Sequence, residues 1–143
     1  MYKKIIWILG ITVVILGYFI YSNWHNTQQL RTSIDRDYRS EMIQMHTVLT
    51  NKDLASPDKH LLMLQHASQL QALSGFTTYG KKSGLVKSYS NTLVLFLLNT
   101  DESDFRENAD RTERLAGLIN QLSDDPLNDK LSNQLMELIT NWK

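Results

Sequence analysis

Residues 75–82 come close to the spacing of the phosphate-binding loop G-x-x-x-x-G-K-[ST]. They read Gly75-Phe76-Thr77-Thr78-Tyr79-Gly80-Lys81-Lys82. In that loop, which joins a strand to a helix, backbone amides bind the phosphates and a final hydroxyl holds magnesium. Here Lys82 takes the place of the hydroxyl residue, Ser83 comes one position late, and a helical pattern precedes the first glycine. We therefore do not expect nucleotide binding.

A second partial motif begins at Ser56. Residues 56–59 read Ser-Pro-Asp-Lys and fit the Ser-x-x-Lys of penicillin-recognising enzymes. The other two boxes of those enzymes occur in the wrong order, and no strand pattern is present to carry the lysine box. A serine followed by a proline and an acidic residue is instead typical of the first turn of a helix.

The residue types that bind metals show no suitable spacing. His25, His46, His60 and His66 include no pair three or four residues apart, which is how one helix presents two metal ligands. The chain has no cysteine, so thiol catalysis and cysteine-based metal sites are excluded. We expect no catalytic residue, no metal and no cofactor.

Two ionisable residues fall on apolar helix faces and form a candidate buried polar pair. His66 lies among leucines on the larger apolar face of its helix, and Glu41 lies on the inward face of the first helix. The favoured interpretation is a hydrogen-bonded core histidine and a glutamate that reaches the edge of the domain. The rival hypothesis is that they meet inside the folded domain, where the pair would sense external pH.

The charges balance overall but are unevenly spread. Fifteen basic residues match fifteen acidic ones, and a nucleic-acid partner is not expected because phosphate binding needs a basic excess. Residues 101–137 carry ten acids against four bases, whereas residues 52–87 carry five bases against two acids. These regions are either two solvated surfaces or a charged docking face.

Residues 5–21 form an uncharged run rich in Ile, Val and Leu. About 17–25 such residues cross a bilayer as a helix. Two lysines precede the run, and the next basic residue is Arg31. Because positive residues stay cytoplasmic, we predict a cytoplasmic tail at 1–4, a transmembrane anchor in membrane lipid at 5–21, and an extracytoplasmic domain at 22–143. A cleaved signal peptide is the competing interpretation, but no small-x-small site follows the run.

The remainder reads as helical throughout. Pro57, Pro126, the glycines within 75–84 and a polar cluster at 99–104 divide it into five amphipathic pieces. The predicted helices end at Thr50, span 56–74, 82–99 and 104–123, and begin at Asp125. Short connections between amphipathic helices favour an antiparallel bundle. The predicted fold class is all-α, with one N-terminal transmembrane helix followed by a four- to five-helix antiparallel bundle.

These features predict a non-enzymatic, single-pass membrane protein whose bundle binds or regulates another envelope protein. The candidate partner-binding loop lies within residues 75–84. It combines three glycines with Phe76, Tyr79, Lys81 and Lys82. The alternatives are an ordinary interhelical connection there and a docking face on the acidic outer side of the fourth helix.

Other functions stay open at this stage. A helix that runs from a membrane into a bundle also fits a ligand- or pH-sensing input module that signals through a membrane partner. A small envelope enzyme would require carboxylates from several helices around one cavity. Gly10 and Gly17 lie on one face of the membrane helix, where they would let two copies approach closely, so a homodimer is a further expectation.

Overall fold

The computed structural model describes the backbone of residues 2–53 and 56–142, and the side chains of residues 15–53 and 58–142. This described part is helical and contains no strand, so the prediction of an all-α fold is confirmed. The chain divides into two compact units, residues 1–33 and 34–143. Helix α1 (Tyr2–Thr50) contributes residues to both units.

The described apolar side chains of the first unit are exposed. Between residues 15 and 21 the exposed fractions range from 51% to 70%, for Ile15, Leu16, Tyr18, Phe19, Ile20 and Tyr21. Trp24 is 59% exposed. The polar residues that follow bond along the helix, as where Thr27 Oγ1 donates to Asn23 O at 2.8 Å. The apolar surface of residues 15–21 is therefore left uncovered by the described residues of this unit.

Among the described residues, no helix is both long enough and apolar enough to cross a membrane. The side chains of residues 5–14, which form the larger part of the predicted anchor, lie outside the described residues. The same holds for the side chains of the predicted tail at 1–4. The anchor and the compartment that it implies remain predictions.

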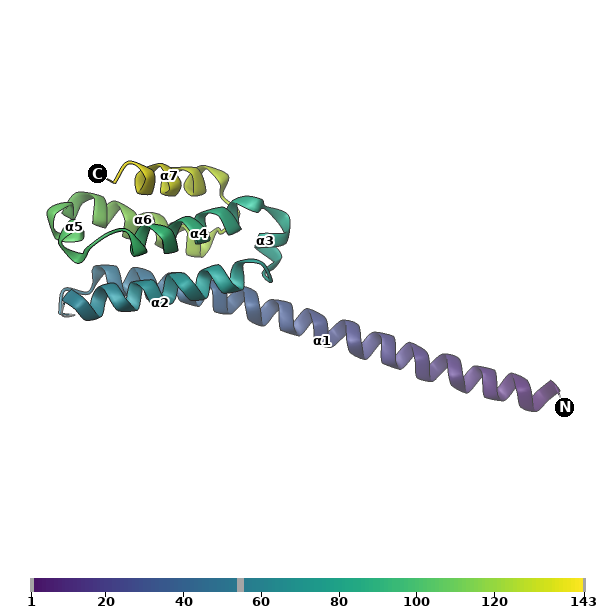
Figure 1. Ribbon diagram of the computed structural model, residues 1–143. Helices are drawn as coiled ribbons and strands as arrows, with labels where there is room; N and C mark the ends of the chain where they lie inside the picture. Colours follow the sequence, from purple (N-terminus) through teal and green to yellow (C-terminus); the bar gives the residue numbers. More distant parts are fainter. Residues whose placement is uncertain (1, 54–55, 143) are drawn as a thin grey trace. The chain divides into compact units, whose positions relative to one another are not determined.

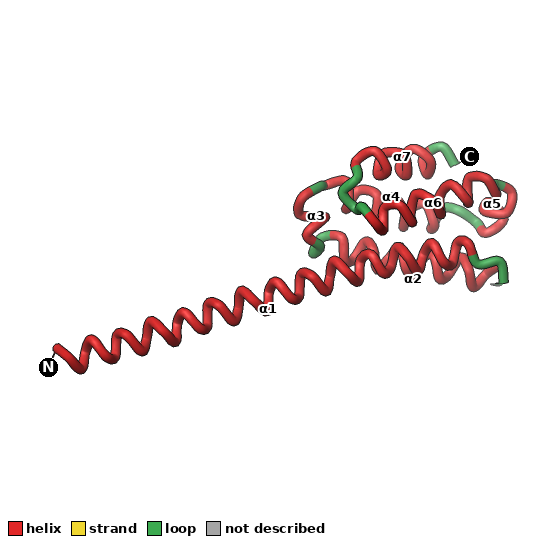
Figure 2. Tube along the Cα trace, turned by 180° about the vertical axis from the view of Figure 1, so that it is seen from behind, coloured by secondary structure: helices red, strands yellow, loops and turns green. Residues whose placement is uncertain are grey.

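The second unit is a bundle formed by residues 34–50 of α1 and the later helices (Figure 1). These are α2 (Ser56–Ser74), α3 (Thr78–Lys82), α4 (Gly84–Leu98), α5 (Glu102–Glu107), α6 (Ala109–Asp124) and α7 (Asp129–Thr140). Helix α2 packs on α4, and α7 packs on both α4 and α6. The view from behind shows α3 and α5 at opposite ends of the bundle (Figure 2).

The core is organised around one face of α1. Tyr38, Met42, Met45 and Leu49 recur at steps of three and four residues and are at most 4% exposed. Residues at this spacing share one side of an α-helix, and the same spacing continues back to Leu30, which is 61% exposed. The other helices complete the core with Met63, Leu70, Val86, Leu93, Leu97, Leu115, Ile119, Leu122 and Leu135.

Local signals in the sequence determine most helix ends. Ser83 and Asn128 cap α4 and α7, because their side chains accept backbone N–H bonds at 3.2 and 3.1 Å. Asp101 and Asp104 form a reciprocal capping box at the start of α5. Helix α2 begins at Ser56 as predicted, although the side chain of Ser56 lies outside the described residues.

The described bundle has more helices than the sequence predicts. The connection at 75–84 contains the short helix α3. The helix predicted at 104–123 is two helices separated at Asn108, whose backbone leaves the helical conformation at φ −111° and ψ 52°. The last helix starts at Asp129 rather than at Asp125. Side-chain capping by Asn128 explains the later start of α7. The capping box of Asp101 starts α5 at Glu102, two residues earlier than predicted.

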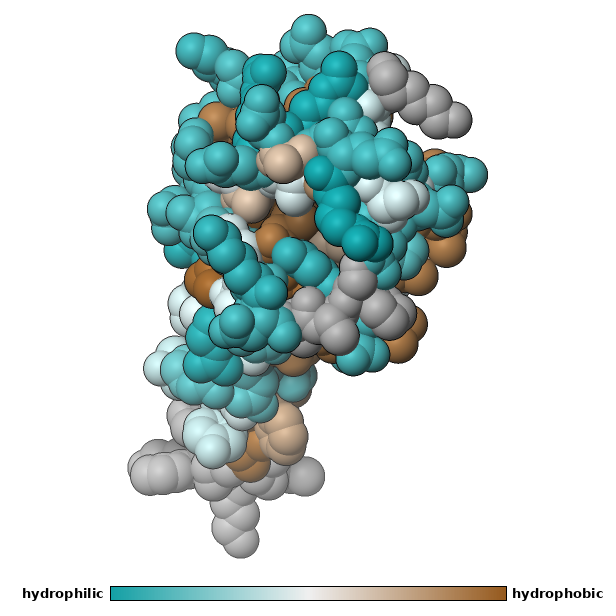
Figure 3. Space-filling model, turned by 90° about the vertical axis from the view of Figure 1, so that its left-hand side faces the viewer, coloured by the Kyte–Doolittle hydropathy of each residue, from teal (hydrophilic) through white to brown (hydrophobic). Residues whose placement is uncertain are grey.

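The end of α4 is partly exposed although residues 93–98 are all apolar. Leu95 and Leu98 are 60% and 61% exposed, because α4 is covered by other helices on only part of its circumference. Leu61 of α2 is also exposed, at 65%. The preceding residue, His60, contacts this end of α4, with its Nε2 2.9 Å from Leu97 O. A view turned by 90° from Figure 1 shows hydrophobic groups along one flank of a largely hydrophilic surface (Figure 3).

Three hydroxyl groups are hydrogen-bonded inside the core. Tyr38 Oη lies 3.0 Å from Tyr89 Oη and 2.8 Å from Ser90 Oγ. All three residues are 0% exposed. Burial disfavours the charged phenolate, so it raises the pKa of Tyr38 to about 12. Burial also raises the pKa of Tyr89, and the neighbouring Tyr38 raises it further.

The free energy of unfolding should fall as the pH rises above about 10. Tyr38 and Tyr89 keep their protons in the folded state at pH values where the unfolded chain has lost them, so alkali favours unfolding. Each tyrosine contributes a slope of about 1.4 kcal/mol per pH unit. Urea unfolding of the full chain in detergent, followed by circular dichroism across this range, measures the slope.

The double variant Tyr38→Phe/Tyr89→Phe should lose most of this slope. The control Tyr18→Phe/Tyr21→Phe removes two tyrosines that are 70% and 62% exposed, and should keep it. Equal slopes in the parent and in the core variant would contradict the prediction.

Candidate functional site

Helix α3 is a single turn whose start is determined by Thr77. Thr77 Oγ1 accepts a hydrogen bond from Gly80 N at 2.8 Å and donates one to Ser74 O at 3.0 Å. One fully buried side chain therefore ends α2 and begins α3. The predicted partner-binding loop is thus a capped helical turn rather than an open connection.

Gly80 allows α3 to lie directly against the end of α2. A Cβ atom at Gly80 would lie 1.8 Å from Ser74 O and 3.1 Å from Thr77 Oγ1. No described glycine has a positive φ angle, so this position requires glycine for space rather than for backbone conformation.

Two charged residues of α1 hold α3 in place. Asp35 Oδ1 accepts a hydrogen bond from Thr78 N at 2.7 Å, and Asp35 Oδ2 accepts one from Thr78 Oγ1 at 2.5 Å. A carboxylate accepts stronger hydrogen bonds than a neutral group does. One turn further along α1, the guanidinium carbon of Arg39 lies 5.8 Å from the centre of the Tyr79 ring, within the range of a cation–π interaction. Arg39 also donates to Asp124 O.

The four residues predicted for partner binding divide into two groups. Tyr79 is half-buried, with its ring packed 6.4 Å from that of Tyr38. Phe76, Lys81 and Lys82 are exposed, and Phe76 is 65% exposed. We refer to these three residues as the α3 surface. It places one aromatic ring and two cations on a backbone that other helices hold in place.

The hydrogen bonds of α3 also explain why the near-match to a phosphate-binding loop does not form one. The backbone amides of such a loop are free to bind phosphate. Here Thr78 N donates to Asp35, and Gly80 N donates to Thr77. The preceding element is the helix α2. The amide of Thr78 therefore binds a carboxylate of its own chain, and the amide of Gly80 binds a hydroxyl, whereas a nucleotide site would offer both to phosphate.

The structure brings Glu41 and His66 together. His66 Nδ1 lies 2.7 Å from Glu41 Oε2, and their side chains are 15% and 22% exposed, respectively. Gln69 lies beside the same carboxylate and, with its amide nitrogen turned toward it, donates to Glu41 Oε1 at 2.8 Å. This polar cluster joins α1 to α2 at the edge of the bundle rather than deep in its core.

The sequence patterns do not identify Asp35, Arg39 or Thr77 as residues of this site. Asp35 and Arg39 lie four residues apart, a spacing typical of an ion pair on a helix surface. Each instead contacts another helix. The only feature of the sequence that points to Asp35 and Arg39 is that both lie within one turn of Tyr38. Their side chains therefore leave α1 beside its buried face.

Comparison with known proteins does not assign this chain to a family. The chain matches no protein-family model, no curated protein and no solved structure. Within the described residues, no group of three or more metal-binding side chains lies together. The function must therefore be inferred from the geometry of this chain.

Replacing Gly80 with alanine should destabilise the protein by about 2 kcal/mol or more, because the added methyl group meets a backbone carbonyl that cannot move without displacing α2. Gly84→Ala is the matched control, since a Cβ atom there meets nothing within 4 Å. That control should change stability by less than about 1 kcal/mol, or increase it, because alanine favours helices. Urea unfolding measures both, and equal effects would contradict the close approach of α3 to α2.

Proposed function

We propose that this chain is a single-pass membrane protein whose helical domain binds or regulates another protein of the cell envelope. Residues 5–21 would be the anchor, residues 1–4 would be cytoplasmic and residues 22–143 would lie outside. The uncharged run and the lysines before it support this orientation. The exposed apolar side chains of residues 15–21 support the membrane anchor, because a lipid phase would cover them.

The α3 surface is the observation that carries the binding proposal. Interfaces favour aromatic side chains on rigid backbones, because such groups lose little conformational entropy when a partner binds. Phe76 is 65% exposed and directly precedes Thr77, the residue that caps α3. Asp35 fixes the same turn from α1. The two lysines at the end of α3 complete a small surface with both apolar and charged character.

Charge favours a partner with an acidic surface. Between residues 59 and 100 the chain carries four lysines and no acidic residue. Lys87 extends the α3 surface, because its Cε atom is 3.8 Å from the position of a Cβ atom at Gly75. Such a basic face steers an acidic partner toward it and helps to select its orientation. Phe76 would then occupy an apolar site on that partner.

Crosslinking in whole cells, followed by recovery of the full chain, should yield one dominant partner protein. The triple variant Phe76→Ala/Lys81→Glu/Lys82→Glu should reduce that product about tenfold or more, because it removes the aromatic anchor and reverses two charges. An unchanged yield would rule out the α3 surface as the docking site.

A matched control changes the same residue classes at exposed positions elsewhere in the bundle. Leu61→Ala/Lys52→Glu/Lys130→Glu alters a side chain as exposed as Phe76, at 65%, together with two exposed lysines. This variant should give the parental yield. A reporter fused after Lys143 tests the orientation independently, and its presence in the cytoplasm would exclude the proposed compartment.

A pH-sensing module that signals through a membrane partner is the second candidate function. The contact between His66 and Glu41 favours it, because histidine is the side chain that ordinarily changes charge between pH 5 and 8. Here α1 and α2 would be the elements that respond, since the pair joins them.

The melting temperature of the full chain, measured from about pH 5 to 8, tests this second candidate. The profile of His66→Gln should differ from that of the parent, because the variant removes the imidazole that contacts Glu41. His25→Gln is the control, since His25 is exposed and bonds to Gln29 on its own helix. Superimposable profiles for the parent and His66→Gln would remove the sensing function.

A further inference from the structure

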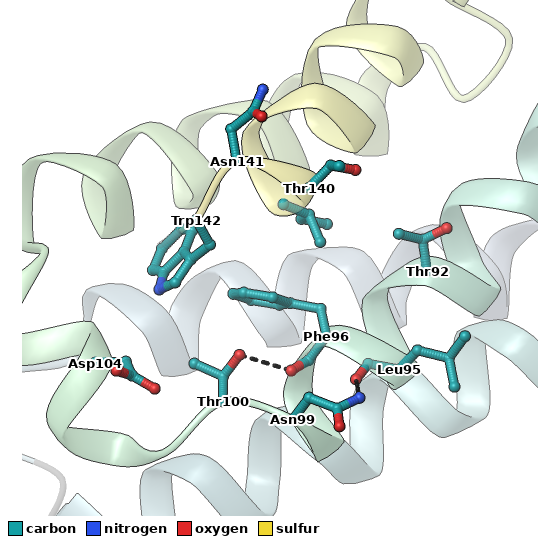
Figure 4. A pocket seen from close by; sticks show the side chains of 10 residues that line it. Thr92, Leu95, Phe96, Asn99, Thr100, Asp104, Thr140, Asn141 and Trp142 are labelled. Atoms are coloured by element: carbon teal, nitrogen blue, oxygen red, sulfur yellow. Dashed lines mark hydrogen bonds between the residues drawn. The ribbon is translucent and has the colours of Figure 1, made fainter.

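A pocket of about 480 Å³ lies between the end of α4, the start of α5 and the end of α7 (Figure 4). Sites for small molecules commonly have volumes of about 300–1,000 Å³. Its apolar part comes from Leu95, Phe96, Ile139 and Trp142, and its polar part from three threonines, two asparagines and one aspartate. It shares no residue with the α3 surface or with the Glu41–His66 pair.

The threonines offer hydrogen-bond acceptors to this pocket. Thr92, Thr100 and Thr140 each donate their hydroxyl hydrogen to a main-chain carbonyl four residues earlier, at 2.9, 2.7 and 2.8 Å. Each hydroxyl oxygen keeps lone pairs that can accept a hydrogen bond. Asn99 likewise donates its amide to Leu95 O at 2.6 Å and keeps its own carbonyl oxygen as an acceptor. A ligand that fits this lining must carry several donors.

Trp142 requires a hydrogen-bond acceptor on the ligand, whereas the threonines require donors. Its side chain is 5% exposed, and its buried indole nitrogen has no acceptor in the described structure. The ring is packed 4.9 Å from Phe96 and 5.5 Å from Phe105, measured between ring centres. Its nitrogen is on the side of the pocket where Thr100 and Asp104 lie (Figure 4). Because a buried N–H without an acceptor is unfavourable, a ligand that supplies an acceptor there would be stabilised.

The charge of the lining narrows the ligand class further. Asp104 is the only charged residue among those that line the pocket, and its Oδ2 accepts a hydrogen bond from Asp101 N at 2.9 Å. A carboxylate or phosphate would face this negative charge with no cation in the lining to bind it, because the nearby Arg111 lies outside the lining and donates to the carbonyls of Asn141 and Trp142. An ammonium group would donate hydrogen bonds to Asp104 and to the threonine oxygens, but it would leave the Trp142 N–H without an acceptor. Hydroxyl groups meet both demands, because each one donates and accepts.

We propose that this pocket binds a neutral sugar. Several ring hydroxyls would donate to the threonine oxygens and to Asp104, and one hydroxyl oxygen would accept from Trp142 Nε1. The C–H faces of the sugar ring would pack on the apolar side chains of Leu95 and Phe96. This proposal stands independently of the docking function assigned to the α3 surface.

Calorimetric titration of the full chain tests this site, in a detergent whose head group is not itself a sugar. The probes are glucose, galactose, mannose and N-acetylglucosamine, with methylamine and acetate as charged comparisons. At least one sugar should bind saturably with a Kd of about 1 mM or lower, and the charged probes should not. Trp142→Phe keeps an aromatic ring without the N–H donor and should weaken the binding about tenfold. Thr140→Val removes an acceptor at an exposed position and should weaken it several-fold.

The control is Thr47→Val on α1. Thr47 donates to Ile43 O at 2.9 Å in the same manner as the pocket threonines, but it lies outside the pocket, so its variant should bind sugar like the parent. The proposal is overturned if no sugar binds, if methylamine or acetate binds as tightly, or if both pocket variants keep the parental affinity. If circular dichroism shows that Trp142→Phe does not fold, the exposed Thr140→Val variant alone tests the site, and parental sugar affinity in that variant overturns the proposal.

Discussion

The second unit depends on the exclusion of water from one face of α1. Tyr38, Met42 and Met45 are essentially unexposed, and burial of such side chains is the main favourable term in folding. Apolar contact has no preferred direction, however, so it does not by itself fix how the other helices are placed. Polar side chains beside the buried face of α1 form directional hydrogen bonds that fix the positions of the other helices. They bind α3, α6 and α2 through Asp35, Arg39, Glu41 and His46.

The sequence was informative where a local rule governs the structure. The helical spacing of Tyr38, Met42 and Met45 predicts the buried face of α1, and the serine at position 56 correctly predicts the start of α2. Two helical wheels raise the hypothesis that Glu41 meets His66, because each residue interrupts an apolar face. Their degree of burial did not follow, since it depends on how far apart α1 and α2 lie at that level.

Other features depend on contacts between distant segments, which periodicity does not report. Three glycines within residues 75–84 suggest an open loop, yet Gly80 permits a close approach of α3 to Ser74. The apolar end of α4 suggests complete burial, yet Leu95 remains exposed and borders a pocket. That pocket joins residues of α4, α5 and α7, and its indole donor becomes significant only once the absence of an acceptor among its described neighbours is known. The sequence predicts none of these features, because each depends on contacts between segments that are far apart along the chain.

The separation of charge within the bundle has a consequence that the balanced totals conceal. Lysines without acidic neighbours occupy the stretch from residue 59 to 100, whereas acids outnumber bases by ten to four between residues 101 and 137. Residues 34–143 carry fifteen acids and twelve bases, so the bundle has a net negative charge as well as an electric dipole moment, and a uniform field both pulls and turns it. Ions screen this effect over a Debye length of about 8–10 Å at physiological salt. Electrostatics therefore both attracts and orients this bundle at short range, and ionic strength sets how strongly it is aligned before any contact forms.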